Sequence, residues 1–211
     1  LMYMYKQKYM LIGFFKYIPD LFQQMPYQSD NELKNVFQME NLNSRRIAGL
    51  ALIVPFKIDN VLDTKATFTY QHTMDRDDNF LNEPYEKSKD SFVINLTNTV
   101  NVSSKPNIKM DISAFYMNGH VQGVYDIHHI SNVNVGLKYT FLNNNAELMA
   151  QVQDIFKDSG AHTSINILNQ YSTMNIKVLT PTLKVSFIYR FGNYKKKQAE
   201  TIDTSRFGRG Q

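Results

Sequence analysis

An alternation of apolar and polar residues near the C-terminus constrains the fold of this chain more than any other feature. From Leu183 to Phe191, apolar side chains occupy every second position, and the positions between them carry Lys184, Ser186 and Arg190, with Ile188 as the one exception. Successive side chains of a β-strand point to opposite faces. The pattern therefore predicts a strand with one apolar face and one polar face.

The same alternation recurs along most of the chain. It is found in residues 48–58, 66–70, 92–96, 108–116 and 133–141. β-Branched and aromatic residues are frequent at the apolar positions, which favours strands over helices. We therefore predict an all-β fold, an antiparallel meander of about eight long strands.

The connections between the predicted strands alternate in length. Residues 58–62, 103–107 and 143–145 make short links, whereas residues 75–90 and 119–127 make longer, polar ones. Short turns at one end and long loops at the other are typical of outer-membrane β-barrels, in which the turns are periplasmic. We therefore predict that these strands form part of a transmembrane outer-membrane β-barrel.

Counting strands backwards from a periplasmic C-terminus extends this prediction. The count gives eight strands, from residues 8–24 to residues 172–191, with further extracellular loops at residues 26–33 and 169–172 and a periplasmic turn at residues 6–7. Residues 1–5 would end a ninth strand whose beginning is missing. We predict that residues 1–191 are the C-terminal part of an N-terminally truncated barrel domain, and that residues 192–211 form a basic periplasmic tail.

The composition excludes several classes of protein. The mean hydropathy is −0.38, and no apolar run approaches the roughly 20 residues that a transmembrane helix needs. A barrel strand passes this test because lipid-facing and lumen-facing residues alternate. There is no cysteine, so neither a disulfide nor a thiolate metal site is possible. The net charge is +4 with no basic stripe interleaved with aromatic residues, so we expect no nucleic-acid partner.

Three motifs resemble those of a known family. Residues 189–192 read Tyr-Arg-Phe-Gly and are followed by the basic segment Asn-Tyr-Lys-Lys-Lys. Residues 152–156 contain Asp-Ile-Phe, and residues 38–42 contain an Asn-Leu pair. These motifs are similar to the closing strand, the penultimate strand and a strand entry of the outer-membrane β-barrel family related to TonB-dependent receptors, common in Bacteroidetes-type bacteria.

The resemblance implies a function and a set of partners. Full-length relatives carry an N-terminal plug and many more strands, and they import nutrients with energy from an inner-membrane complex. The chain would then be the C-terminal part of a nutrient-uptake transporter in the outer membrane of a Gram-negative bacterium. Its partners would be the lipid bilayer, the missing barrel strands and plug, and an unknown small-molecule or glycan ligand. The outer-membrane assembly machinery would read the strand from Leu183 to Phe191.

Two other classes of protein stay open at this point. The first is a complete small barrel of eight strands with a structural or adhesive role. The second is a soluble β-sheet binding protein. A requirement for detergent during refolding separates the second from both membrane readings.

Metal binding is the first chemistry to consider, because imidazoles are good ligands for transition metals. The five histidines, which the strand count places near the extracellular end, are His72, His120, His128, His129 and His162. Polar loops commonly collect histidines, so we expect no metal and no cofactor. His128 and His129 are the pair whose replacement would test this expectation.

The acidic segment from Asp75 to Glu86 has a spacing loosely similar to that of a calcium loop. Such a loop needs glycine at its sixth position for a sharp turn, but this chain has Phe80 there. We expect a solvated acidic loop instead.

The sequence offers little for catalysis. Asp111, Glu147 and Asp154 are candidates to point into a lumen, but they form neither a triad nor a carboxylate pair. The one nucleophile–base pair to consider is a serine as nucleophile with His72 as its base. We expect no catalytic residues and no enzyme. Four basic residues would line a polar interior and, in a receptor, face the plug: Lys109, Lys138, Lys184 and Arg190.

Overall fold

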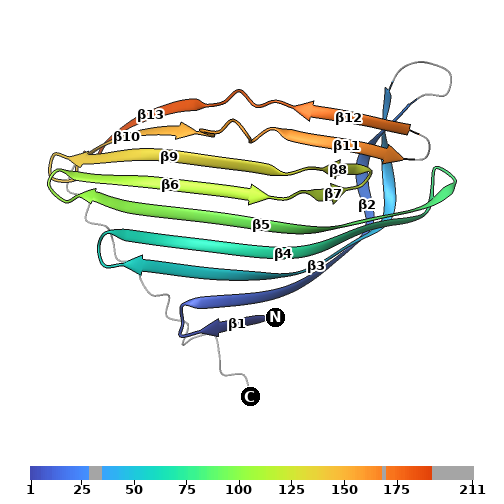
Figure 1. The fold of residues 1–211 in the computed structure, drawn as a ribbon, viewed down its shortest axis with the longest axis horizontal. Helices are drawn as coiled ribbons and strands as arrows, with labels where there is room; N and C mark the ends of the chain where they lie inside the picture. Colours follow the sequence, from blue (N-terminus) through green and yellow to red (C-terminus); the bar gives the residue numbers. More distant parts are fainter. Residues whose placement is uncertain (29–34, 168–169, 192–211) are drawn as a thin grey trace.

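The structure, a computed structural model, describes residues 1–28, 35–167 and 170–191. It forms an antiparallel, all-β fold (Figure 1), which confirms the predicted fold class. No helix among the described residues is long and apolar enough to cross a membrane. The predicted basic tail at residues 192–211 lies outside the described residues.

Nine strands form the larger sheet, and each pairs with its neighbours in antiparallel fashion. In spatial order they are β1 (Met2–Tyr5), β2 (Tyr9–Gln28), β3 (Asn35–Ile58), β4 (Leu62–Phe80), β5 (Glu83–Ser103), β6 (Asn107–Met117), β9 (Ile130–Phe141), β10 (Ala146–Gln153) and β13 (Thr182–Tyr189). The described strands leave β1 and β13 as the two edges, so the sheet is not closed.

Four shorter strands form a second sheet that continues the first. Its order is β12 (Gln170–Ile176), β11 (Ala161–Ile167), β8 (Tyr125–Ile127) and β7 (His120–Gln122). Along the chain, β6 runs into β7, β8 into β9, β10 into β11, and β12 into β13. Counted as continuous paths, these make the eight long strands that we predicted, preceded by the short β1. The last of them, predicted as one strand over residues 172–191, is in fact two strands interrupted at residues 177–181.

Short links lie together at one end of the sheet, which we call the turn end. The predicted links at residues 58–62, 103–107 and 143–145 are confirmed by the ends of the flanking strands. Asn143 and Asn144 adopt the left-handed backbone region that tight turns require and that asparagine tolerates. The opposite end, with longer excursions of the chain, we call the far end.

The two longer loops were wrongly predicted. β4 runs to Phe80 and β5 starts at Glu83, so residues 75–90 are mostly strand with a turn at Leu81 and Asn82. Residues 119–127 likewise form the β7–β8 hairpin. Their polarity was misleading because every second side chain, such as Asp75 and Asp77, is buried against other strands, while those between face solvent. β2 also extends past the predicted limit of residue 24, and part of the predicted loops at residues 26–33 and 169–172 lies outside the described residues.

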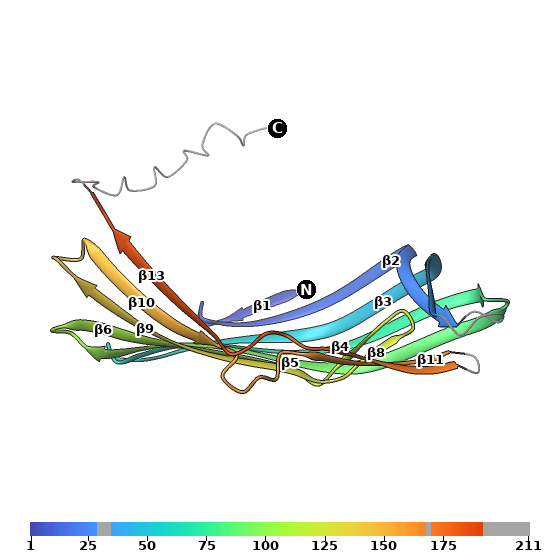
Figure 2. The same cartoon turned by 90° about the horizontal axis from the view of Figure 1, so that it is seen from above.

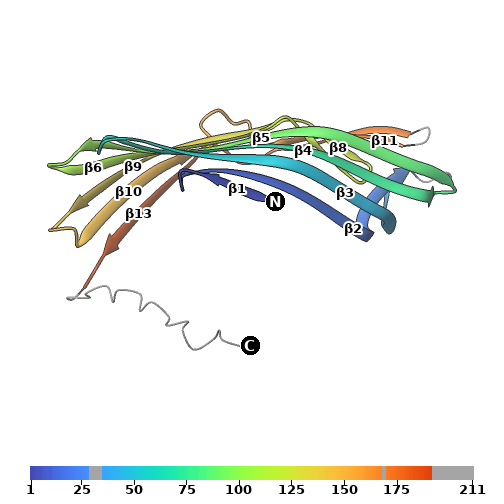
Figure 3. The same ribbon diagram turned by 90° about the horizontal axis from the view of Figure 1, so that it is seen from below.

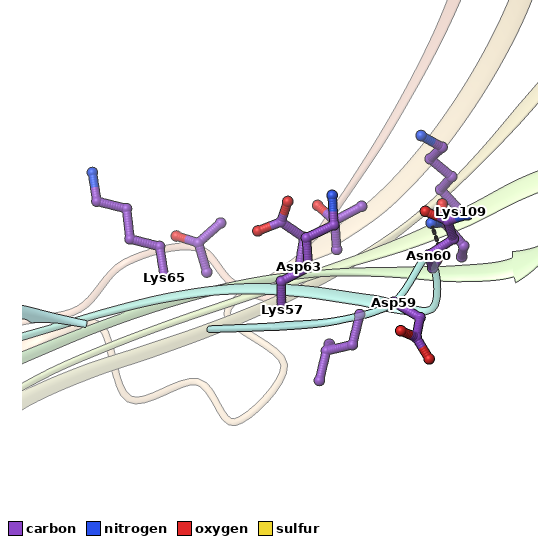
Figure 4. A pocket seen from close by; sticks show the side chains of 10 residues that line it. Lys57, Asp59, Asn60, Asp63, Lys65 and Lys109 are labelled. Carbon is purple, nitrogen blue, oxygen red and sulfur yellow. Dashed lines mark hydrogen bonds between the residues drawn. The ribbon is translucent and has the colours of Figure 1, made fainter. Parts of the chain in front are cut away.

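The large sheet is curved (Figures 2 and 3). Its two faces differ in polarity. The concave face carries Lys65 (Figure 4), so alternation places Phe68 and Tyr70 on the convex face. Register continues the convex face across the strands, since Phe68 lies opposite Leu52 and Ile94. The exposed fraction of Phe68 is 45%, which a sheet in water would not tolerate across so wide a face.

Aromatic residues mark two levels of this convex face. Tyr70 and Phe92 contact each other on the far-end side, with ring centroids 5.2 Å apart and the ring planes tilted by 45°. The turn-end level is formed by Tyr139, Phe141, Phe187, Tyr189 and Phe191. From Leu62 to Tyr70 the strand covers about 27 Å at about 3.4 Å per residue. Barrel strands are tilted, and these nine residues agree with the roughly 9–11 residues that a tilted strand needs to cross the apolar core of a bilayer.

The far end has a second layer. The far halves of β2 and β3 cross the other strands (Figure 1). Beneath them is a small buried core made of Met25, Leu42, Phe80, Val124, Ile165 and Ile167. Because this core needs a protein layer on both sides, the far end packs as a soluble domain does.

Candidate functional site on the concave face

A polar pocket of about 300 Å³ lies on the concave face at the turn end (Figure 4). Lys57, Lys65 and Lys109 line it, and Asp63 stands among them. Asp59 points to the opposite face (Figure 4). The pocket therefore presents three cations and one acid toward the interior of the curve.

The cationic character continues across the neighbouring strands. Lys109 lies directly opposite Lys138, and like charges in that position are destabilising. Asp111, an acid on the same face, accepts a hydrogen bond from Thr99 Oγ1 at 2.6 Å. This surface thus gains stability when an anionic group approaches it.

The predicted interior lysines all lie on this concave face. Lys184 shares a row of the sheet with Gln151 and Asp111. Arg190 lies 3.4 Å from the carboxylate of Glu147, so its charge is partly compensated.

A buried ion pair organises the concave face at the far end. Arg45 Nε and Nη2 donate to the two oxygens of Asp75, each at 2.6 Å. The same carboxylate accepts the backbone N–H of Gly123 at 2.7 Å, and Arg45 also donates to Gln23 Oε1 at 3.4 Å. Asp75 is fully buried. The pair joins three parts of the chain: β2, the β3–β4 wall and the β7–β8 hairpin.

Side chains of β5 hold the same hairpin by its backbone. Tyr85 Oη donates to Gly123 O at 2.9 Å, Lys87 Nζ donates to Val124 O at 3.3 Å, and Ser91 Oγ donates to Gly119 O at 2.6 Å. An ion pair between Lys89 and Asp126 adds to these contacts. The hairpin is therefore fixed against the concave wall.

Burial shifts the titration of several groups in this far-end network. It raises the pKa of Tyr85, and the nearby carboxylates of Asp75 and Asp126 act in the same direction. Burial lowers the pKa of Lys87 and also that of His120, where the charges of Arg45 and Lys89 add to the effect. The region thus favours the neutral forms of its weakly basic and phenolic groups.

Sequence reasoning missed Arg45, Gln23 and this set of β5 side chains. A signal was present, because Tyr85, Lys87 and Lys89 alternate with period two in a segment that we predicted to be a loop. Polar alternation in a strand is as regular as apolar alternation, but it does not stand out in a polar segment.

The two histidines considered as metal ligands contact different partners. His128 Nε2 lies 3.2 Å from Ser164 Oγ, and His129 Nε2 lies 3.7 Å from Asp158 Oδ1. Among the described residues, no three His, Cys, Asp or Glu side chains are arranged to hold a metal ion. His128 and His129 therefore have no third ligand in the described part of the chain.

The prediction that the acidic segment from Asp75 to Glu86 is a solvated loop is wrong. Asp75 is in the buried ion pair, and Asp77 accepts the backbone N–H groups of Asn43 and Asn79 at 3.0 and 2.8 Å. These two carboxylates therefore serve the packing of β3 and β4.

The catalytic candidates are likewise engaged elsewhere. His72 Nδ1 lies 2.9 Å from Asp90, whose same oxygen accepts from Tyr70, and no serine completes the group in the described contacts. Asp154, considered for the lumen, is buried and accepts hydrogen bonds from Ser159 Oγ at 2.6 Å and from Asp158 N at 3.1 Å. It stabilises its own loop.

Comparison with known proteins adds one finding to this geometry. The model of the outer membrane protein beta-barrel family matches residues 1–189. No curated protein and no solved structure matches the chain.

Proposed function

We propose a transport function from one premise, which is that this chain belongs to the outer membrane protein beta-barrel family and resides in the outer membrane. In this proposal it is the C-terminal barrel portion of a TonB-dependent-receptor-like nutrient transporter of a Bacteroidetes-type bacterium. Residues 1–191 form barrel wall and residues 192–211 a periplasmic tail. The role is not enzymatic.

The observation that carries the proposal is the shallow curvature of the nine-stranded sheet (Figure 2). In an eight-stranded barrel, the first and last strands of such a sheet would pair with each other. Here β1 and β13 stand apart, and lipid does not tolerate unpaired strand edges. Both facts favour a barrel with many more strands over a complete small barrel.

The exposed apolar convex face disfavours a soluble binding protein.

The concave face adds support of a different kind, because Lys65, Lys109 and Lys138 form a cationic wall without enough acids to balance it. A plug that fills the lumen would supply the missing partner groups. In the orientation typical of such barrels, the turn end is periplasmic and the far end extracellular.

Uptake in the source bacterium tests this proposal. We expect deletion of the gene to abolish energy-dependent uptake of one class of nutrient among labelled iron chelates, cobalamin and oligosaccharides, as judged with and without a protonophore. Unchanged uptake of every class would overturn the transport role.

Charge reversal on the concave wall provides a matched test in the same assay. Lys109→Glu with Lys138→Glu is expected to reduce the uptake that the wild-type gene restores. Arg46→Glu with Arg76→Glu, an equal charge change on the convex side of the far end, is expected to restore it fully. Equal restoration by both variants would argue against a role for the concave wall.

A further inference from the structure

A second pocket lies on the convex face where β10 ends and β13 begins. It has a volume of about 380 Å³ and is lined by Lys157, Asp158, Gly160, His162, Asn175, Ile176, Lys177, Val178 and Thr180. Figures 2 and 3 show the orange connection between β10 and β11 bulging from the convex side of the sheet. Ile165 and Ile167 are buried in the concave core, so alternation places His162 on the convex face with this loop.

Hydrogen bonds fix the conformation of the loop that connects β10 and β11. Asp154 at its start accepts hydrogen bonds from Ser159 Oγ and from the backbone of Asp158 and Ser159. Ser131 on β9 donates to Asp158 Oδ2 at 2.5 Å and fastens the loop to the next strand. The position of Lys157 between these anchors is therefore fixed by the fold.

The charges around the pocket are unbalanced. Its one acid, Asp158, is engaged by Ser131 and lies 3.7 Å from His129. Lys157 and Lys177 contact no acid among the described residues. Two unpaired ammonium groups therefore border one cavity.

The pocket also lies at the level where the chain leaves the apolar band. β10 and β13 each have 8 residues, close to the roughly 9–11 that cross a bilayer. β11 begins and β12 ends on the far side of this level. Phe156 in the loop is 69% exposed and Val178 is 51% exposed, so apolar side chains adjoin the two lysines. Such a mixture is suited to the boundary between acyl chains and headgroups.

We propose that this convex-face pocket binds a phosphate group of an anionic membrane lipid through Lys157 and Lys177. Charge-assisted contacts to phosphate are among the strong hydrogen bonds of proteins. Asn175 and His162 offer further polar atoms to the same cavity. The proposal needs only the membrane location of the family and is independent of transport.

Lipid binding to the full-length gene product tests the proposal. The protein is placed in phosphatidylcholine nanodiscs, lipid A carrying two phosphates is added, and retained lipid is measured by native mass spectrometry. We expect Lys157→Gln with Lys177→Gln to weaken lipid A binding about fivefold to tenfold, the effect of losing two partly exposed charge contacts. Lys109→Gln with Lys138→Gln, the same loss of charge on the concave face, is expected to bind as wild type does.

Three outcomes would overturn the proposal. They are equal binding by both double variants, equal retention of lipid A from which the phosphates have been removed, and displacement of the lipid by inorganic phosphate at equal concentration. A normal shift of gel mobility on heating shows that each variant is folded. Lys157→Arg with Lys177→Arg should restore binding, because it keeps both charges.

Discussion

The two halves of this sheet are stabilised in opposite ways. In the turn-end half the sheet is a single layer, and convex side chains such as Leu50, which is 53% exposed, contact no protein layer. In the far half, Leu42 and Val124 are completely buried, and a fully buried Asp75 is paired with Arg45. The comparison teaches that lipid can replace a protein core for strands inside the bilayer. Strands that extend beyond it must build their own core.

Removing the buried carboxylate is expected to have the largest effect. Asp75→Ala leaves the Arg45 guanidinium uncompensated in the far half and should cost about 3–5 kcal/mol there. Hydrogen exchange of the β7–β8 hairpin would measure the loss. Asp63→Ala, an acid in the open turn-end pocket, serves as the control and should change local stability by less than about 0.5 kcal/mol. Similar effects of the two substitutions would remove the distinction between the halves.

A charge on the convex face should lower the unfolding free energy of the turn-end half selectively. Ala66→Arg places a cation on the convex face midway between Leu62 and Tyr70, near the middle of the apolar band, and should cost about 2–4 kcal/mol of unfolding free energy in lipid vesicles. Thr67→Arg puts the same cation one residue away on the concave face and should be nearly neutral. If the two variants unfold at the same denaturant concentration, the convex face does not contact lipid.

A smaller effect is expected from loss of one buried hydroxyl in the far half. Ser91 is fully buried, and its Oγ donates to Gly119 O, so Ser91→Ala leaves a carbonyl group without this donor. The expected cost is about 1–3 kcal/mol. Faster exchange of the Val121 amide, with no change in the strands of the turn end, would support the assignment. Uniform destabilisation of both halves would contradict it.

The smallest effect is a pH dependence confined to the far half. Burial lowers the pKa of His120 in the folded state, so the unfolded hairpin binds its proton more readily. Stability is therefore present above the unfolded value of about 6.5 and is lost as pH falls through the lowered folded pKa. Hydrogen exchange of the hairpin should accelerate over that range in wild type but not in His120→Gln. An identical pH profile in the variant would assign the effect to another group.

The same division explains which parts of the fold could be predicted from sequence. The strands and links of the turn end follow from alternation, because each side chain there meets either lipid or the polar interior, and both demands act locally. The same pattern did not predict the structure of the far half. Asp75 binds Arg45 and Gly123, which are 30 and 48 residues away in the sequence, and no local pattern encodes such partners. Residues 75–90 consequently resembled a solvated loop.

The candidate sites divide in the same way. The interior position of Lys109 and Lys138 was predicted from alternation, but their direct opposition depends on the register between β6 and β9. The pairing of Lys157 with Lys177 around one cavity was not predicted, because 20 residues and a strand reversal separate them.

The sequence by itself determined an all-β meander with one apolar face and the end at which its chain turns back sharply. Period-two alternation is sufficient for that, since a strand needs only its own residues to define two faces. Only the tertiary structure decided that the far halves of β2 and β3 fold over the concave face, and that Asp75 is buried. Those features depend on contacts between distant strands, and their free energy exists only once the whole sheet is assembled.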